Sequence, residues 1–487
     1  MKRIILFCLI LSLSVLVDCA STMQTGANKP AILKIYTEVY PPLSYAENGT
    51  VTGQATEVVR ELIRRTGTRA DIQLASWEEG YKAVMEKPNV ALFSVAMTPE
   101  RKPLLQWVGP IAFLDANLYA RKGSKLEIEN LAGAKKLPKI VTIKDYYTEL
   151  FLRNEGFTNL ESVATEEIAI RKLLKGEVQL FSSSNITMPA LLEKVGATMD
   201  DVENVLNLST NMIYIAFSKG TSPELVALWQ KRLDEMKADD AFRRIYAKWL
   251  PAETPPEIIQ LMTEEYPPVT FMKDGKASGF VTDMVREIIA KQGIPDNIHL
   301  TSWRNAYNLA AINPNVALFS TERTKEREKL FHWVGPVGKN SAIFYARKGS
   351  GIKINSLGEA KKLAAIATTT DWFTEQDLKD KGFTNLVSSP LPVTCVKQLM
   401  NGEVQLSIFT DITIPEIVKD AGYTMDDLEP VFTVSNTYFS IAMSLGTPLE
   451  EVRKWQSVLD GLKADGTFEK IYRGYFPDAD IDDLLKK

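Results

Sequence analysis

The sequence PNVALFS occupies residues 88–94 and returns unchanged at residues 314–320. Its apolar centre, bounded by polar residues, predicts a short strand that is buried on both faces, as in the middle of a parallel sheet. The stretches around it recur as well, always at an offset of 226 residues. The other shared blocks are TEVYPP at 37–42 with TEEYPP at 263–268, YARKGS at 119–124 and 345–350, GFTNL at 156–160 and 382–386, and GEVQL at 176–180 and 402–406.

The repeat runs without a gap from Lys34 to Pro251 and again from Gln260 to Pro477. Its period is far longer than the roughly 20–50 residues of a solenoid unit, so it predicts two copies of one complete domain. A position that is kept in both copies marks a constraint, and a position that differs marks divergence. The proline-rich segment PAETPPE at 251–257 is expected to be a semi-rigid spacer between the copies.

Composition narrows the class of protein. With 45% hydrophobic and 24% charged residues the chain of 487 residues is typical of globular proteins. A net charge of −4 argues against nucleic-acid binding, which needs a basic surface. Beyond Cys8 and Cys19 the chain holds only Cys395, so no disulfide can join the two copies.

The N-terminus has the pattern of a secretory signal. Lys2 and Arg3 precede an apolar run over residues 4–17, and small residues follow near Cys19. The run is too short to favour a transmembrane helix. Residues 1–20 are therefore predicted to be a signal peptide. Lipidation of Cys19 is left open, because Asp18 stands where that processing prefers a small residue.

Strand and helix patterns alternate within each copy, which predicts mainly parallel sheets flanked by helices. TEVVRELIRRTG, for example, predicts an amphipathic helix that ends at Gly67. The segments near Tyr119 and Tyr214 are expected to cross between two lobes, with a cleft at the carboxyl ends of the strands. The predicted boundaries are 30–252 for the first copy (lobe 1 about 30–120 and 215–252, lobe 2 about 121–214) and 258–480 for the second (lobe 1 about 258–346 and 441–480, lobe 2 about 347–440).

Three motifs, each present twice, carry a resemblance that covers both copies nearly end to end. They are a Tyr-Pro-Pro turn followed by a glycine turn (40–53 and 266–279), Thr-x-Glu-Arg after the buried strand (98–101 and 324–327), and LKADDAFRRIYAKWLP with its partner LKADGTFEKIYRGYFP. In these motifs the chain resembles the family 3 bacterial extracellular solute-binding proteins, the amino-acid-type periplasmic binding proteins. The resemblance implies two tandem bilobal domains of the type II periplasmic-binding-protein fold, each with two hinge strands.

The arginine of the second motif is the first candidate for ligand binding. Thr98 and Thr324 fit helix N-caps, and Pro99 fits the first helical position. An arginine in that first turn is disfavoured by the helix dipole. Keeping Arg101 and Arg327 in both copies therefore suggests a bound anion, since a guanidinium can hold a carboxylate through two parallel hydrogen bonds. The alternative is a surface arginine paired with a nearby carboxylate.

Aromatic and acidic residues recur around the same motifs. Tyr40 and Tyr266 match the family position where a ring packs on the ligand, and Trp77 and Trp303 fall near a second aromatic wall or in the core. Acids two residues before the tyrosines can accept a ligand ammonium or neutralise the arginine. These further candidates are Glu38 and Glu264. Hydroxyl side chains complete the predicted first-lobe set: Ser94, Thr98, Ser320 and Thr324.

The second lobe departs from the family pattern. Amino-acid binders usually place an aspartate there to hold the ligand ammonium, but the matching positions are Ser184 and Thr410. The residues that follow, Asn185 and Asp411, are predicted contacts as well. This departure argues against an ordinary α-amino acid as the ligand.

Two further departures distinguish the copies. The small-residue loop of the family is replaced by KDYY and TDWF, in which Asp145 and Asp371 are predicted contacts. Five residues before each arginine, where the family often has a hydroxyl, this chain has Ala96 and Glu322, and Glu322 is a further candidate. Because a buried charge changes which ligands a site tolerates, the clefts are predicted to differ in preference, or one of them to be degenerate.

The resemblance implies a non-catalytic protein that closes over a small carboxylate-bearing solute, an amino acid or related metabolite, and delivers it to a membrane transporter. It implies a periplasmic or otherwise extracytoplasmic location, no cofactor, no metal, no nucleic acid, and membrane contact only through a lipid anchor. Two alternatives stay open, a sensor module that signals to a separate partner and a lyase or dehydratase. For catalysis the sequence leaves only a carboxylate pair such as Glu38 with Asp145.

Overall fold

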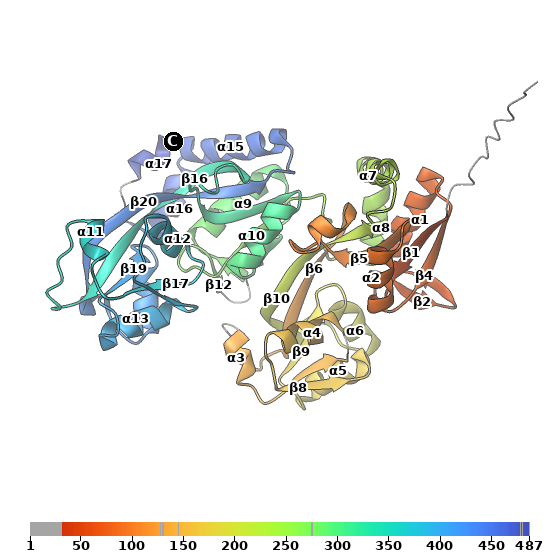
Figure 1. Cartoon of the computed structure of the whole chain (residues 1–487), viewed down its shortest axis with the longest axis horizontal. Helices are drawn as coiled ribbons and strands as arrows, with labels where there is room; N and C mark the ends of the chain where they lie inside the picture. Colours follow the sequence, from red (N-terminus) through yellow and green to blue (C-terminus); the bar gives the residue numbers. More distant parts are fainter. Residues whose placement is uncertain are drawn as a thin grey trace, which may run out of the picture.

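The computed structural model describes residues 32–486 except 127, 129, 130, 145, 274, 275, 478 and 480. The predicted signal peptide, with Cys19, and the candidate Asp145 lie outside the described residues. The two copies form two α/β bodies that lie side by side, with the first copy in red to yellow and the second in green to blue (Figure 1). In the part of the chain that is described, no helix is long and apolar enough to cross a membrane.

The first copy contains the strands β1 (Leu33–Thr37), β2 (Tyr45–Glu47), β3 (Thr50–Thr52), β4 (Ala70–Leu74), β5 (Val90–Ala96), β6 (Gln106–Arg121), β7 (Ile140–Ile143), β8 (Leu160–Val163), β9 (Leu180–Ser184) and β10 (Val202–Phe217). Its helices are α1 (Gln54–Thr66), α2 (Trp77–Glu86), α3 (Leu131–Lys135), α4 (Tyr147–Asn154), α5 (Glu166–Lys175), α6 (Met188–Lys194), α7 (Pro223–Ala238) and α8 (Ala241–Trp249), with short 3-10 helices η1 (Lys102–Leu104) and η2 (Met199–Asp201).

The second copy contains the strands β11 (Gln260–Thr263), β12 (Phe271–Lys273), β13 (Lys276–Ser278), β14 (Ile298–Leu300), β15 (Val316–Glu322), β16 (Phe331–Arg347), β17 (Ile366–Thr369), β18 (Leu386–Ser389), β19 (Leu406–Thr410) and β20 (Leu428–Ser444). Its helices are α9 (Phe280–Gln292), α10 (Trp303–Ile312), α11 (Leu357–Ala360), α12 (Phe373–Asp380), α13 (Pro392–Asn401), α14 (Ile414–Asp420), α15 (Leu449–Ala464), α16 (Thr467–Tyr475) and α17 (Asp482–Leu485), with the 3-10 helix η3 (Met425–Asp427).

Both copies have the same sheet topology. The strand order is β4-β1-β5-β10-β6-β9-β7-β8 in the first copy and β14-β11-β15-β20-β16-β19-β17-β18 in the second. In each, parallel strands at the two ends are joined by one long antiparallel pair, β6 with β10 or β16 with β20. We call the end around β1 or β11 lobe 1, and the end around β7 or β17 lobe 2. The predicted fold class, tandem bilobal α/β domains with two hinge strands each, is confirmed.

Local sequence explains the elements that frame the cleft. The VALFS strand is β5, and its residues from Val90 to Val95 are all buried, as expected for a central strand. The helix predicted to end at Gly67 is α1, and Gly67 has φ 65°, a conformation that closes a helix at little cost in glycine. Long helices of lobe 1 bury Trp229 and Trp455 completely, on α7 and α15.

The helix predicted after Thr98 and Thr324 does not form. The first copy has only the short η1 there, and the second has turns. The chain between each threonine and the long strand that begins at Gln106 or Phe331 is short, so it leaves room for no more than one or two helical turns. The capping hydrogen bond survives, because the Thr98 hydroxyl accepts from the Arg101 N–H at 3.3 Å. The helix-dipole argument for a bound anion therefore does not apply.

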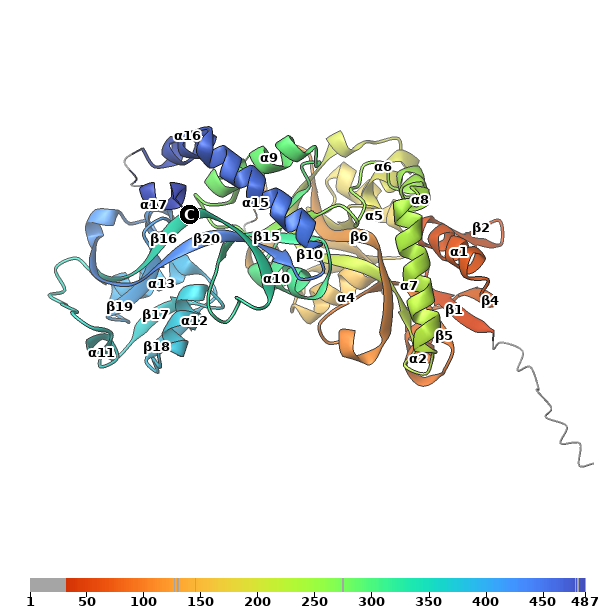
Figure 2. The same cartoon turned by 90° about the horizontal axis from the view of Figure 1, so that it is seen from above.

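The two copies share an interface. Helix α10 and strand β14 of the second copy pack on the hinge strands β6 and β10 of the first, and Figure 2 shows α10 beside β10 from above. One hydrophobic cluster draws its buried members from both copies: Met97, Phe113, Met212, Tyr214, Met262, Ala306, Leu309, Ala310, Val316, Leu318, Phe331 and Ala442. Across it, His299 Nδ1 lies 2.8 Å from Asp115 Oδ2, and the Tyr214 hydroxyl donates to Asn313 at 3.1 Å.

Candidate solute-binding clefts

A serine with a left-handed backbone stands at the cleft edge of each central strand. Ser94 has φ 67° and Ser320 has φ 61°, values that non-glycine residues rarely adopt. At both places the register against the neighbouring hinge strand shifts, as in a β-bulge. Bulges of this kind re-aim side chains and concentrate beside functional sites.

Each arginine of the Thr-x-Glu-Arg motif lies on two aromatic rings. The Arg101 guanidinium carbon is 4.9 Å from the centre of the Trp77 ring and 5.5 Å from that of Tyr81, and Arg327 stacks in the same way on Trp303 and Tyr307. The rings adjoin because they are four residues apart at the start of a helix. This stacking holds the guanidinium in place without fully covering its donors.

The arginines also donate to the backbone. Arg101 Nη1 donates to the Ala96 carbonyl and Arg327 Nη1 to the Glu322 carbonyl, both at 3.3 Å. Only in the second copy is there a carboxylate at that strand end. The Glu322 carboxylate lies 4.0 Å from Arg327 and accepts a hydrogen bond from Asn340 at 3.2 Å.

Acids beside the arginines have raised pKa values. Burial raises the pKa of Glu38 to about 7, and the charge of Arg101 opposes the shift. Burial raises the pKa of Glu264 to about 8, the neighbouring Glu322 adds to the rise, and Arg327 opposes it. Burial likewise raises the pKa of Glu322 to about 7 against the charge of Arg327. Perturbed groups of this kind mark candidate functional sites.

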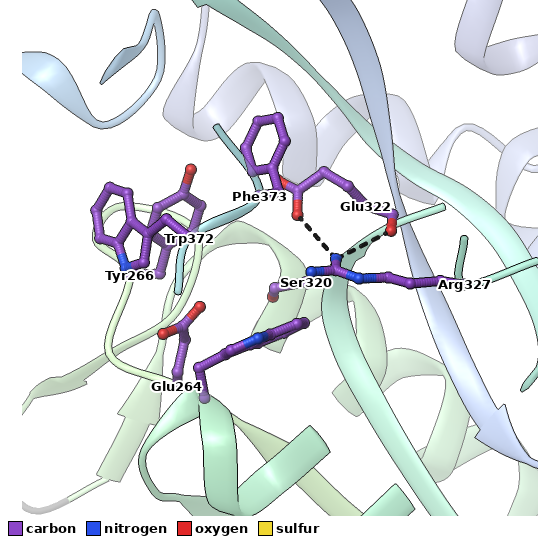
Figure 3. A pocket seen from close by; sticks show the side chains of 8 residues that line it. Glu264, Tyr266, Ser320, Glu322, Arg327, Trp372 and Phe373 are labelled. Carbon is purple, nitrogen blue, oxygen red and sulfur yellow. Dashed lines mark hydrogen bonds and ion pairs between the residues drawn. The ribbon is translucent and has the colours of Figure 1, made fainter. Parts of the chain in front are cut away.

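A narrow pocket lies between the lobes of the second copy. Its lining residues are Glu264, Tyr266, Trp303, Ser320, Glu322, Arg327, Trp372 and Phe373. Figure 3 shows the acids and Arg327 facing inward, with Trp372 and Phe373 brought from lobe 2. Thr324 stands in the turn that carries Arg327, and its hydroxyl accepts the Arg327 N–H at 3.4 Å.

Hydroxyl groups of lobe 2 meet the Tyr-Pro-Pro turn of lobe 1 in both copies. The Ser184 hydroxyl donates to that of Thr187 at 2.7 Å, and Thr187 donates to the Pro41 carbonyl at 2.9 Å. Burial raises the pKa of Tyr40, which a hydrogen bond with Ser184 partly offsets. In the second copy the hydroxyls of Tyr266 and Thr410 are 3.2 Å apart. The predicted tyrosines and second-lobe hydroxyls are thus brought together.

Other predicted second-lobe contacts already have partners in the chain. The Asn185 side-chain oxygen accepts from the Asp115 N–H at 2.8 Å, and its amide donates to Glu253 of the spacer at 2.6 Å. Asp411 accepts from the Ser341 N–H at 2.9 Å in the same way. Asp371 is in an ion pair with Arg304 across the mouth of the second cleft.

Sequence reasoning missed three residues. Trp372 and Phe373 line the second cleft, although the TDWF loop was noted only for its aspartate. In the first copy Glu166, at the start of α5 in lobe 2, acts electrostatically on Tyr40 and Tyr146, and burial raises its own pKa against the charge of Lys194. No spacing signal identified Glu166, because its counterpart in the second copy is Pro392.

Metal binding has no support in the described ranges, where no group of three or more His, Cys, Asp or Glu side chains could hold a metal ion. Cys395 is buried and free. The groups that face the clefts are arginines, carboxyls, hydroxyls and aromatic rings, which together suit recognition of a small organic ion.

A two-lobed α/β body with such a pocket between its lobes has the architecture of a solute-binding protein. The family model for the bacterial extracellular solute-binding proteins, family 3, matches residues 33–252 and again residues 258–478. The chain therefore belongs to this family, with the family domain present twice.

Individual relatives are distant. The L-cystine-binding protein TcyA of Bacillus subtilis (strain 168) is 22% identical over 230 residues, which cover 47% of this chain and 84% of that protein. The "Probable amino-acid ABC transporter-binding protein" of Haemophilus influenzae is 24% identical over 221 residues, 43% of this chain and 81% of that protein. Among solved structures, the B. pertussis BvgS periplasmic domain matches 92% of this chain and 91% of its own with 14% identity and a TM-score of 0.38.

Proposed function

We propose that this protein is a non-catalytic, extracytoplasmic binding protein whose lobes close over a small carboxylate-bearing solute, which it delivers to a membrane permease. The first cleft is the carboxylate site. The observation that carries the proposal is the state of Arg101, which is stacked on Trp77 and Tyr81 yet has no ion-pair partner among the described residues. A fixed guanidinium with free donors is suited to a carboxylate.

The surroundings of Arg101 favour a solute that also carries a positive charge. Glu38 and Arg101 contribute one acid and one base to the lobe 1 wall, so a zwitterion adds no net charge there. Glu166 supplies an acid from lobe 2, where the family aspartate is absent. The names of the two relatives, which refer to cystine and amino acids, support an amino-acid-like solute.

Closure is expected to be a hinge motion on β6 and β10, because the chain passes from lobe 1 to lobe 2 along β6 and returns along β10. The solute first binds lobe 1 through Arg101 and Tyr40. Contacts from Ser184 and Thr187 on lobe 2 then favour the closed form, since a ligand shifts the equilibrium only by its differential affinity for the two forms.

The test is a thermal-shift screen of the chain lacking residues 1–20 against amino acids, dicarboxylates, aromatic acids and small peptides, followed by calorimetric titration of any ligand found. Arg101→Ala is expected to weaken binding by about 2–5 kcal/mol, and Arg101→Lys by less, because lysine keeps the charge without the planar fork. The matched control is Arg171→Ala, an exposed arginine on α5. Unchanged affinity in Arg101→Ala contradicts the assignment.

Delivery to a permease needs a separate measurement. Cells that lack this gene are expected to lose high-affinity uptake of the labelled ligand and to regain it with the wild-type chain but not with Arg101→Ala. Unaltered uptake in the deletion strain would favour a signalling role over transport.

A further inference from the structure

The second cleft has more acidic than basic side chains in its lining. Its charged lining residues are Glu264, Glu322 and Arg327, two acids for one base. Arg304 and Asp371 stand at the cleft mouth, but they pair with each other and leave the balance unchanged. Once both acids are ionised, a solute with one positive charge neutralises the lining, whereas an added carboxylate makes it more negative in a place that is shielded from water.

One of these acids already stands at the arginine. The Glu322 carboxylate lies 4.0 Å from Arg327, and the two side chains are only 6% and 12% exposed. In the first copy the same position is Ala96, so that strand end supplies no carboxylate to Arg101. Glu322 therefore stands beside the nitrogen of Arg327 that donates to the strand-end carbonyl, so a ligand carboxylate that approaches this side of the guanidinium meets a second acid.

A buried hydroxyl in this pocket has no partner. Ser320 is 5% exposed, and its Oγ makes no hydrogen bond to any described residue. The equivalent Ser94 Oγ is 3.3 Å from the hydroxyl of Ser44. In Figure 3 the Ser320 hydroxyl and the Glu264 carboxylate point toward the same part of the pocket. Buried polar groups are nearly always satisfied, so this unpaired hydroxyl points to a ligand atom that can donate or accept a hydrogen bond.

The remaining walls are aromatic. Tyr266 and Trp372 meet edge to face with ring centres 5.3 Å apart, and Phe373 adds a third ring from the start of α12. The free space between these walls is only about 10 Å³, room for about one water molecule, so the lobes must part to admit a solute. Aromatic rings beside carboxylates are suited to a small organic cation.

We propose that the second cleft binds a small organic amine without a carboxylate group, with its ammonium between Glu264 and Ser320 and its apolar part against the aromatic rings. Glu322 excludes the corresponding amino acid by holding Arg327. The inference rests on the proposed function, since it assumes that the clefts close over solutes. It assigns different classes of solute to the two copies.

Proton linkage gives the proposal a second signature. The pKa of Glu264 is about 8 and that of Glu322 about 7 in the empty cleft, because of burial, with Arg327 opposing both shifts. An ammonium favours the ionised acids, so below these values binding must release protons. Amine affinity is therefore expected to fall as the pH drops from about 8 to about 6, by up to roughly tenfold per pH unit for each proton released.

The experiment compares amines with the amino acids from which they differ by a carboxylate. Phenethylamine and tryptamine are titrated against L-phenylalanine and L-tryptophan in the Arg101→Ala chain, so that the first cleft does not contribute. At pH 8 at least one of the amines is expected to bind, and both amino acids are expected to fail. Binding that is tighter for the amino acids than for the amines, or no amine binding, overturns the proposal.

Variants of the second cleft sharpen the result. Glu264→Gln is expected to weaken the amine at least about tenfold and to flatten the pH dependence. Glu322→Ala is expected to admit the amino acid, because Arg327 becomes free. The control is Glu450→Gln, an exposed position on α15. An unchanged amine affinity in Glu264→Gln overturns the proposal.

The wild-type chain separates this inference from the proposed function. If a carboxylate solute binds and is lost in Arg101→Ala while the amines do not bind, only the amine assignment fails. If neither solute class binds the wild-type chain, the proposed function fails as well.

Discussion

The two copies share the scaffold around the arginine and differ in the side chain at the end of the central strand. Each has an arginine stacked on a tryptophan and a tyrosine, and a serine in a left-handed conformation at the end of a buried strand. At the position five residues before the arginine, the first copy has Ala96 and the second has Glu322. Among the described residues, only the second arginine has a carboxylate within 4.0 Å of its guanidinium.

The difference shows how duplication can change ligand preference without changing the fold. An acid supplied by the protein stands beside the second arginine, while both arginines keep their stacking on a tryptophan and a tyrosine. The backbone donation to the strand end is 3.3 Å in both copies, so the arginine itself has not moved.

The largest expected effect comes from placing the acid of the second copy at the equivalent position of the first copy. Ala96→Glu places a carboxylate beside Arg101, and repulsion of a ligand carboxylate is expected to weaken binding in the first cleft by several kcal/mol, about 2–5. Calorimetric titration of the carboxylate solute measures this. Ala96→Gln is the neutral control of similar size, and an equal loss in both variants would mean that bulk rather than charge is responsible.

The interface between the copies contains the pair of His299 with Asp115, and the pH dependence of stability tests this pair. Burial by itself lowers the pKa of His299. The charge of Asp115, the hydrogen bond to Asp115 and the charge of Glu253 raise the pKa by more than burial lowers it, so the net shift is upward. A raised pKa means that the stabilisation is fully present below the unfolded value of about 6.5 and is lost as the pH rises through the folded value.

His299→Gln introduces the glutamine that the first copy has at the equivalent position, Gln73. It is therefore expected to destabilise the protein at pH 6 by about 1.5–3 kcal/mol and by less at pH 9. Calorimetric melting at the two pH values measures the loss. A penalty that is equal at both values would show that the pair with Asp115 carries no charge-dependent energy.

A matched pair of core tryptophans compares the lobe 1 cores. Trp229 Nε1 donates to the Thr68 hydroxyl at 3.0 Å, whereas Trp455 Nε1 has no partner in the described part of the chain, where Ile294 takes the place of threonine. Trp229→Phe is expected to cost about 1 kcal/mol more than Trp455→Phe, because only the first loses a hydrogen bond. Hydrogen exchange of peptides from α7 and α15 measures each copy separately, and equal penalties would contradict this expectation.

The smallest effect is expected at the mouth of the second cleft. Arg304 and Asp371 form an ion pair between the lobes with side chains 73% and 50% exposed, and the first copy has Glu78 at the position of Arg304. Arg304→Ala is expected to weaken closure by only about 0.2–1 kcal/mol, and less in high salt. Ligand affinity at low and high ionic strength tests this. A loss that does not respond to salt would indicate a packing role.

Much of the fold could be predicted from the sequence. The constant offset of 226 residues required two equal domains, the apolar VALFS run required a central strand, and Gly67 marked a helix end. These features are local, since burial on both faces of a strand and a positive φ in glycine impose their patterns on neighbouring residues. The arginine candidates followed from their repetition, and the tyrosine candidates followed from the resemblance to the family.

Other features were decided only by tertiary structure. Pattern reasoning placed a helix after Thr98, but the start of β6 left room for no more than one or two helical turns, and the arginine is held by aromatic rings instead of a helix terminus. Glu166 and Trp372 reach the clefts from lobe 2, and His299 reaches Asp115 across 184 positions of the chain. The sequence by itself determined the two copies and their strands, because those depend on local periodicity. Which charges face each other, and therefore what each cleft can bind, depends on contacts between segments that only the folded chain brings together.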